Sequence, residues 1–172
     1  MPSMIREKIR AIPDFPKKGI LFQDITPVLE DPKTFRSLID LFVERYTGMK
    51  IDKVVAVESR GYLVGAPLAF ALGAGLVLVR KPGMLPHKVD RQSYALEYGT
   101  DTLEMHLDAM GPGQRALVID DLLATGGTAE AAGMLVRRRG AELVEFGFIV
   151  ELRGLNGRAR LGKDAVFSLL DY

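Results

Sequence analysis

The stretch VIDDLLATGGTA, residues 118–129, places two carboxylates and a glycine turn directly after an apolar run. The run Ala116–Ile119 leads into Asp120 and Asp121, and small or hydroxylated residues follow from Ala124 to Thr128. Backbone N–H groups in such a turn can converge on an anion at the start of a helix, where the helix dipole adds positive charge. No Gly-Lys-Ser/Thr sequence follows, so this is not a Walker loop. We predict a cradle for one phosphate group.

The two aspartates need a different task, because carboxylates repel a phosphate. They could accept hydrogen bonds from sugar hydroxyls, hold a metal ion or stabilise positive charge. A ribose 5-phosphate would satisfy the whole arrangement, with its phosphate in the loop and its hydroxyls on Asp120 and Asp121. The alternative is an acidic pair that only caps a helix beside a turn. The joined pattern, between an apolar run and a helix, favours the binding site.

The elements around this stretch alternate between strands and helices. KVVAV, residues 53–57, is a continuous apolar run typical of a strand that is buried on both faces. Helices are predicted at about 62–72, with Gly73 as its C-cap, and at 128–139, closed by Gly140. The predicted strands of the sheet are residues 53–57, 76–79, 116–120, 143–152 and 165–170.

Such alternation predicts a parallel sheet covered by helices on both faces. Ligands of these sheets bind beyond the carboxyl ends of the strands. Three segments should therefore meet on the ligand side: Glu58–Gly61, Arg80–Gly83 and Asp120–Thr128.

Outside this core the patterns are less regular. Ile5, Ile9 and Ile12 share one helical face, which predicts a short helix over residues 3–12. Residues 13–30 are predicted to be irregular, and a helix should begin at Asp31-Pro32. YALEY and TLEMH, residues 94–98 and 102–106, predict a pair of antiparallel strands.

Composition indicates an ordinary globular chain. Its 172 residues predict one domain, and a formal net charge of +1 gives no indication of nucleic acid or membrane partners. The absence of cysteine excludes disulfides and Cys-ligated metals. The N-terminus has no apolar core of a signal peptide, and no apolar run approaches the roughly 20 residues that span a bilayer. We expect a cytoplasmic location.

The stretch VIDDLLATGGT resembles the phosphoribosyl-diphosphate binding motif of the type I phosphoribosyltransferases. Other segments are similar to the adenine phosphoribosyltransferases in particular, in their order and spacing, and the similarity covers essentially the whole chain. These segments are FPKKGILFQDITPVL (15–29), ESRGY (58–62), RKPGMLP (80–86) and LEYGTDTLEMH (96–106).

The resemblance implies the type I phosphoribosyltransferase fold, an α/β fold with a central, mainly parallel sheet flanked by helices. A small hood would come from about residues 1–30 and a mobile two-stranded loop from about 81–98, within a single domain, 1–172. The family transfers ribose 5-phosphate from 5-phosphoribosyl 1-diphosphate to N9 of adenine, giving AMP and diphosphate. The resemblance also implies a homodimer and Mg²⁺ carried mainly by the donor, with no direct protein ligand.

The resemblance assigns site residues by position. Glu97, Asp120 and Asp121 would be catalytic, with Glu97 handling the purine's proton. Leu21, Phe22, Gln23 and Leu122 would bind adenine. Met84 departs from the family, since many members have lysine there, and this removes one phosphate contact. The residues that would bind the donor or AMP are Arg60, Arg80, Lys81, Tyr98, Asp120, Asp121, Ala124, Thr125, Gly126, Gly127 and Thr128.

Three rival functions fit parts of the sequence. A transferase for another base, such as xanthine or guanine, is disfavoured by residues 15–29. A regulator that senses the donor without turnover usually adds a DNA-binding domain, for which this chain has no room. A phosphatase would want an acidic nucleophile with metal ligands on other strands, and only Glu58 offers one.

Overall fold

The computed structural model describes residues 2–96 and 98–172. The chain divides into two compact units, one up to Arg45 and one from Tyr46 onward. The single-domain organisation stays a prediction. Elements of the first unit are α1 Pro2–Lys8, β1 Arg10–Pro13, β2 Leu21–Asp24, α2 Thr26–Glu30 and α3 Pro32–Tyr46, whose last residue belongs to the second unit.

The N-terminal helix is shorter than its periodicity predicts. Helix α1 ends at Lys8, and residues 10–13 form strand β1, which pairs antiparallel with β2. Ile12 lies opposite Phe22 in this hairpin. The prediction of a helix to residue 12 was wrong because strand pairing with a segment farther along the chain outweighed the local spacing. Residues 13–30, predicted to be irregular, contain β2 and α2.

The start of helix α3 follows the prediction. Asp31 lies just before Pro32, and its Oδ1 accepts hydrogen bonds from the backbone N–H groups of Lys33 at 2.9 Å and Thr34 at 3.0 Å. A carboxylate at this position satisfies donors that have no partner inside the helix.

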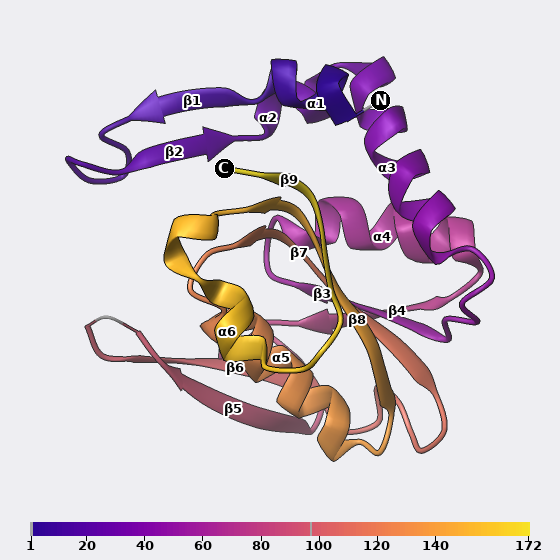
Figure 1. Ribbon diagram of the computed structural model, residues 1–172. Coiled ribbons are helices and arrows are strands. Elements are labelled where there is room, and N and C mark those ends of the chain that lie inside the picture. Colours follow the sequence, from indigo (N-terminus) through magenta and orange to yellow (C-terminus); the bar gives the residue numbers. More distant parts are fainter. Residues whose placement is uncertain (1, 97) are drawn as a thin grey trace. The chain divides into compact units, whose positions relative to one another are not determined.

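A five-stranded parallel sheet forms the centre of the second unit and confirms the α/β fold (Figure 1). The strand order is β4-β3-β7-β8-β9. The chain runs outward from β3 to β4 and, in the other direction, from β7 to β8 and β9, so β3 and β7 flank the switch point where such sheets bind ligands. The strands are β3 Lys53–Val57, β4 Gly75–Val79, β7 Arg115–Leu123, β8 Glu142–Glu151 and β9 Val166–Asp171.

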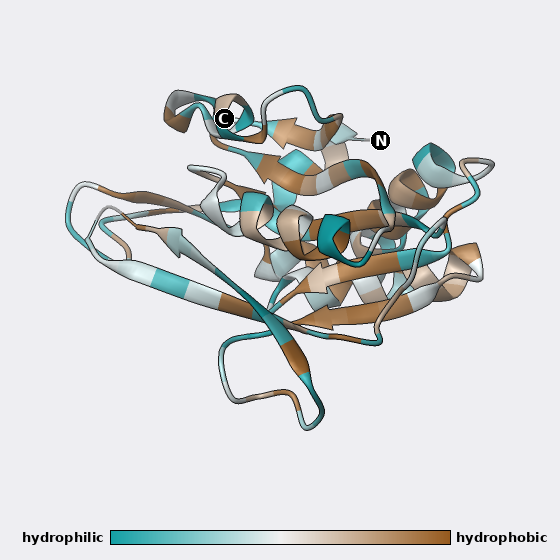
Figure 2. Cartoon of the chain, turned by 90° about the horizontal axis from the view of Figure 1, so that it is seen from below, coloured by the Kyte–Doolittle hydropathy of each residue, from teal (hydrophilic) through white to brown (hydrophobic). Residues whose placement is uncertain are grey.

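Helices cover both faces of this sheet (Figure 1). Helix α4, Gly61–Leu72, lies against the face that carries Ala56, and α5, Gly127–Arg138, lies against the opposite face, where Val55 and Val57 join its core. Buried strands with apolar residues on both sides explain this layering, and Figure 2 shows the sheet as mainly hydrophobic. The C-cap predicted at Gly73 is confirmed by its left-handed φ of 66°.

Replacing Gly65 with alanine should destabilise the protein without touching the strand ends. A Cβ at Gly65 would lie 2.6 Å from the Cβ of Ala56, so α4 would have to move off the sheet. Overpacking of this kind costs about 1–3 kcal/mol, which urea unfolding would measure as a lower midpoint with an unchanged m-value. Unchanged stability would show that α4 shifts freely.

An antiparallel hairpin, β5 Val89–Ala95 and β6 Thr100–His106, also belongs to the second unit. The predicted pairing is confirmed, but β5 begins five residues before the predicted residue 94, and the turn includes Leu96. The second unit also contains η1 Arg153–Leu155 and α6 Gly157–Leu161, which the sequence analysis missed. In the described part of the chain, no helix has the length and apolar character to cross a membrane.

Candidate active site

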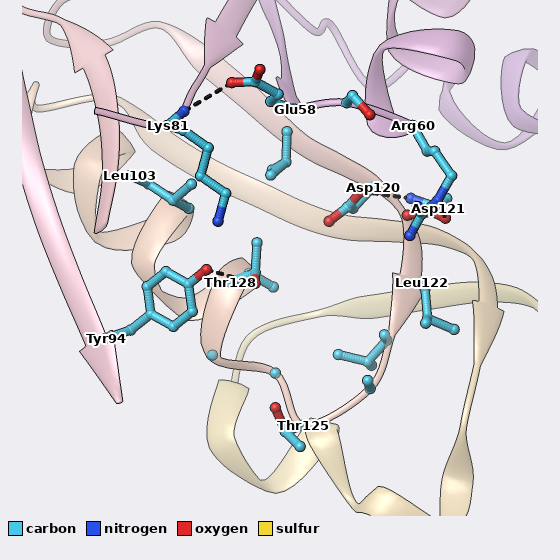
Figure 3. A pocket seen from close by; sticks show the side chains of 17 residues that line it. Glu58, Arg60, Lys81, Tyr94, Leu103, Asp120, Asp121, Leu122, Thr125 and Thr128 are labelled. Atoms are coloured by element: carbon cyan, nitrogen blue, oxygen red, sulfur yellow. Dashed lines mark hydrogen bonds and ion pairs between the residues drawn. The ribbon is translucent and has the colours of Figure 1, made fainter. Parts of the chain in front are cut away.

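A pocket of about 340 Å³ lies at the carboxyl ends of β3 and β7 (Figure 3). Residues of all three segments predicted to meet line its walls: the segment after β3, the segment from Asp120 onward and, through Lys81, the segment after β4. The pocket therefore lies at the switch point of the sheet. Its lining residues are Val57, Glu58, Ser59, Arg60, Lys81, Tyr94, Leu103 and the run from Asp120 to Ala129.

The adjacent carboxylates lie within β7, which continues to Leu123 instead of ending at residue 120 as predicted. The backbone N–H of Asp121 donates to Asp120 Oδ1 at 2.8 Å, and Arg60 Nε donates to Asp121 Oδ2 at 2.5 Å. Burial raises the pKa of Asp120 well above its ordinary value of 3.8, and the nearby charge of Asp121 raises it further. The pair therefore favours groups that donate hydrogen bonds or carry positive charge.

The phosphate cradle predicted from the sequence is a tight loop between β7 and α5. Gly126, at the N-cap of α5, has φ +89°, a conformation that favours glycine. Ala124, Thr125 and Thr128 line the pocket with it. Helix α5 directs its free N–H groups and positive dipole end at this loop, an arrangement that binds anions.

Helix α6 supports this loop. A Cβ built on Gly126 would lie 2.6 Å from the carbonyl oxygen of Gly157, and one built on Gly157 would lie 2.4 Å from the carbonyl oxygen of Ala124. The two glycines let the backbones approach this closely. Gly157 is therefore a supporting residue that sequence reasoning missed, since no local signal links it to a loop some thirty residues earlier.

The comparisons with known proteins agree with this geometry. Residues 25–170 match the family described as "Phosphoribosyl transferase domain". An adenine phosphoribosyltransferase of Anaeromyxobacter dehalogenans (strain 2CP-1 / ATCC BAA-258) is 59% identical over 172 residues, 100% of each chain. The crystal structure of the enzyme from Thermoanaerobacter pseudethanolicus superimposes with a TM-score of 0.97 at 49% identity, covering 100% of both chains. The chain belongs to the adenine phosphoribosyltransferase family.

A second solved relative comes from Saccharomyces cerevisiae. This adenine phosphoribosyltransferase is 42% identical, covers 98% of each chain and superimposes with a TM-score of 0.94. Its structure is a complex with D-2,5-dideoxy-2,5-imino-altritol 1,6-bisphosphate and adenine. Family membership makes this chain a phosphoribosyltransferase and identifies its fold as that of the adenine phosphoribosyltransferases.

The basic residues expected to bind diphosphate in an adenine phosphoribosyltransferase have carboxylate partners here. Arg60 and Lys81 line the pocket, and Lys81 Nζ contacts Asp101. Arg80 instead extends to Glu58, with its Nη2 3.1 Å from Glu58 Oε1. The pairing is consistent with cations that exchange a carboxylate for an incoming anion.

Glu58 is a residue whose role the sequence analysis left open. Its carboxylate accepts hydrogen bonds from Arg80 and from the backbone N–H of Lys81, the latter at 2.9 Å. The Arg80 hydrogen bond is the main cause that lowers the pKa of Glu58 below its ordinary value. Glu58 thus ties the end of β3 to the basic segment after β4. The sequence signal was its position between a buried strand and Arg60.

The residues expected to bind adenine lie on two segments. Leu122 lines the pocket, whereas Leu21, Phe22 and Gln23 form part of β2 in the first unit. Within that unit, the Phe22 ring packs edge-on against Phe15, with centroids 5.1 Å apart.

Tyr98, which was predicted to bind the donor, lies between β5 and β6. Tyr98 is 83% exposed there, and Glu97 lies outside the described residues. The roles predicted for both stay predictions.

Proposed function

We propose that this chain transfers ribose 5-phosphate from 5-phosphoribosyl 1-diphosphate to N9 of adenine, giving AMP and diphosphate for purine salvage. The observation that carries the proposal is one pocket in which an anion cradle, two adjacent carboxylates and two cationic side chains face the same space. The yeast relative binds adenine together with an imino-altritol bisphosphate, which supports adenine and a phosphorylated sugar as the substrates here. The cytoplasmic location expected from the sequence stays a prediction.

In this proposal the phosphate loop anchors the 5-phosphate and leaves the ribose over the end of β7. Asp120 and Asp121 accept hydrogen bonds from the ribose hydroxyls. As the bond to diphosphate weakens, positive charge develops on the sugar, and the fixed carboxylates stabilise that charge more than they stabilise the ground state. Arg60 and Lys81 hold the departing diphosphate.

Magnesium fits the chemistry of these side chains, since carboxylate oxygens are the ligands it prefers and a nearby cation would relieve the charge that raises the pKa of Asp120. We propose that the donor carries most of its ligands, with Asp120 and Asp121 nearest to it. When bound, the ion would neutralise charge on the diphosphate. The carboxylates still position the sugar hydroxyls in this arrangement.

Adenine recognition is part of the same proposal. Leu122 would contact one face of the base and Phe22 the other, while backbone groups of Leu21 and Gln23 read its Watson–Crick edge. A carbonyl that accepts from the 6-amino group rejects 6-oxopurines, which present an acceptor there. Glu97 would take the proton that adenine loses as N9 attacks.

A base panel would test the function directly. We would incubate the protein with phosphoribosyl diphosphate, Mg²⁺ and adenine, hypoxanthine, guanine or xanthine, and measure the nucleotide formed. AMP formation confined to adenine is the expected result. Turnover of a 6-oxopurine would contradict the account of the base pocket, and donor binding without any turnover would favour a regulator.

We further propose a homodimer that buries an apolar surface on the second unit. Phe70 is 91% exposed on α4, and Leu63 lies on the same helix seven residues earlier. Leu76 and Leu78 on the edge strand β4 are also exposed. Larger contiguous patches of exposed apolar side chains typically mark interaction surfaces, and we propose that these residues form one.

Replacing Phe70 with glutamate should therefore convert the dimer to a monomer. Dimerisation would bury the introduced carboxylate without a partner. The free energy that this costs typically exceeds what a single interface residue contributes to association. Sedimentation equilibrium would measure the mass. Met134→Glu, at an exposed position on α5, is the matched control and should stay dimeric. A monomeric parent protein would rule out the dimer.

A further inference from the structure

Three side chains that line the pocket, and a fourth from the β5–β6 hairpin, form a continuous chain of polar contacts. Thr128 Oγ1 donates to the Tyr94 hydroxyl at 3.3 Å, and this hydroxyl donates to Asp101 Oδ2 at 3.3 Å. Asp101 Oδ2 also accepts from Lys81 Nζ. Figure 3 shows the Tyr94 hydroxyl directed at Thr128, with the Lys81 side chain extending into the same space. These contacts link Thr128 of the phosphate loop to Lys81, which is proposed to bind diphosphate.

The two central residues come from the β5–β6 hairpin. Tyr94 and Asp101 are directly opposite each other in its register. Tyr94 is 9% exposed, and the other Asp101 oxygen, Oδ1, accepts from the backbone N–H of Thr102 at 2.8 Å. A carboxylate with contacts on both oxygens has little rotational freedom. Asp101 is therefore a fixed acceptor.

Lys81, in contrast, has a long flexible stem and lies in the segment after β4. Holding such a side chain in one rotamer costs conformational entropy, and a site that fixes it before the ligand arrives avoids that cost on binding. Asp101 supplies such a constraint. The Lys81 ammonium has three N–H donors, so a bond to Asp101 leaves two for an incoming anion.

The position of Asp101 also indicates that it supports Lys81 from behind. Lys81 and Tyr94 line the pocket, whereas Asp101 is not among the described residues that do. The ammonium therefore stands between the pocket and the carboxylate and shields an incoming diphosphate from it. The Lys81 hydrogen bond is the main cause that lowers the pKa of Asp101, which keeps this group ionised at neutral pH.

We propose that Asp101 is a positioning residue that holds Lys81 Nζ toward the diphosphate end of the pocket, with Tyr94 connecting this arrangement to the phosphate loop. The proposal rests on the proposed function, because that function assigns the diphosphate to Lys81. Asp101 and Tyr94 thereby join the residues that organise the donor site. Neither of them touches the reacting atoms.

An ion pair that served only stability would change the melting temperature when removed, and would leave donor binding unchanged. The Lys81 and Asp101 side chains are 46% and 30% exposed, and exposed ion pairs contribute little to stability. Removing the Asp101 charge should thus leave the melting temperature nearly unchanged. The effect should appear in donor binding, and the affinity for adenine should not move.

Asp101→Asn is the decisive variant. We expect the KM for phosphoribosyl diphosphate to rise about tenfold, as for the loss of one charge-assisted contact. The KM for adenine should be unchanged and kcat should vary by less than about threefold. Asp101→Glu should recover part of the loss. Asp108→Asn, at a side chain 72% exposed after β6, is the matched control and should match the parent protein.

A double-mutant cycle with Lys81→Met separates positioning from any other role of Asp101. If Asp101 acts through Lys81, Asp101→Asn should add nothing in the Lys81→Met background. Additive effects would overturn the proposal, and so would an unchanged or lower donor KM in Asp101→Asn alone. A lower KM would show that Asp101 competes with the donor.

Calorimetric titration with phosphoribosyl diphosphate and Mg²⁺ keeps this test independent of turnover. If the parent protein makes no AMP but binds the donor, the proposed function fails while the Asp101 prediction can still be measured as a tenfold change in Kd. If donor affinity is the same in the parent and in Asp101→Asn, the positioning role fails whatever the activity.

Discussion

Replacing Asp120 with asparagine should stabilise the unliganded protein at neutral pH and nearly abolish AMP formation. Burial and the charge of Asp121 raise the pKa of Asp120, so the folded chain holds this proton more tightly than the unfolded chain. The free energy of unfolding therefore falls as the pH rises from about 4 through the folded-state pKa. Asparagine is neutral at every pH and escapes this loss, while its side-chain oxygen can still accept from the Asp121 N–H.

Calorimetry at pH 4 and pH 7.5 would measure the effect. We expect the melting temperature of Asp120→Asn to exceed that of the parent by about 2–4 °C at pH 7.5, equivalent to about 1 kcal/mol in a chain of this size. The difference should shrink toward pH 4 and vanish below it, because the Asp120 carboxyl is then protonated in both the folded and the unfolded chain. The Asp108→Asn variant should follow the parent at both pH values.

The activity of Asp120→Asn should move in the opposite direction. The developing positive charge on the sugar would lose one of two facing carboxylates, and losses of this kind lower kcat by about 10²–10³. A variant that is more stable yet inactive would identify Asp120 as a group kept for function at the expense of folding. Lower stability at pH 7.5, or full activity, would contradict the assignment.

Replacing Gly126 with alanine should disrupt the phosphate loop. An alanine at φ +89° is strained by about 1–3 kcal/mol, and its Cβ would lie 2.6 Å from the Gly157 carbonyl oxygen. Both clashing groups are held by backbone, so the loop must move. A displacement of about 1 Å can cost a hundredfold in rate, and we expect a donor KM at least tenfold higher. Urea unfolding and steady-state kinetics would measure the two effects.

Gly154→Ala is the matched control for this variant. Gly154 lies in η1, close to Gly157 in the chain, has no positive φ, and a Cβ there would meet nothing within 4 Å. Its stability should stay within about 0.5 kcal/mol of the parent protein. If Gly126→Ala binds the donor as well as this control does, the loop is not held against α6 as its backbone geometry indicates.

The sequence was most informative where structure depends on neighbours in the chain. The strands β3, β4 and β8, the helices α4 and α5 and the cap at Asp31 were predicted within a few residues, because apolar periodicity, glycine C-caps and acidic N-caps are local signals. The same holds for the Asp120–Thr128 stretch, where strand, carboxylates, loop and helix follow one another without a break.

The elements that the sequence did not predict correctly share a different cause. Ile12 of strand β1 continues the helical spacing of Ile5 and Ile9, and only the pairing of β1 with β2 makes this segment a strand. Strand β5 extends back to Val89, opposite His106, although the local alternation predicted a strand only from residue 94. Helix α6 is short, and it packs against the phosphate loop from about thirty residues away. Each case depends on contacts between segments distant in sequence.

By itself, then, the sequence determined the α/β class, the family and the loop that can hold a phosphate. These depend on patterns within single segments, and the resemblance added residue assignments that await their tests. Only the tertiary structure decided which carboxylate faces which cation: Glu58 with Arg80, Asp101 with Lys81 and Asp121 with Arg60. The partners in these pairs are 20 or more residues apart, and nothing in one segment specifies the charge that another will bring beside it.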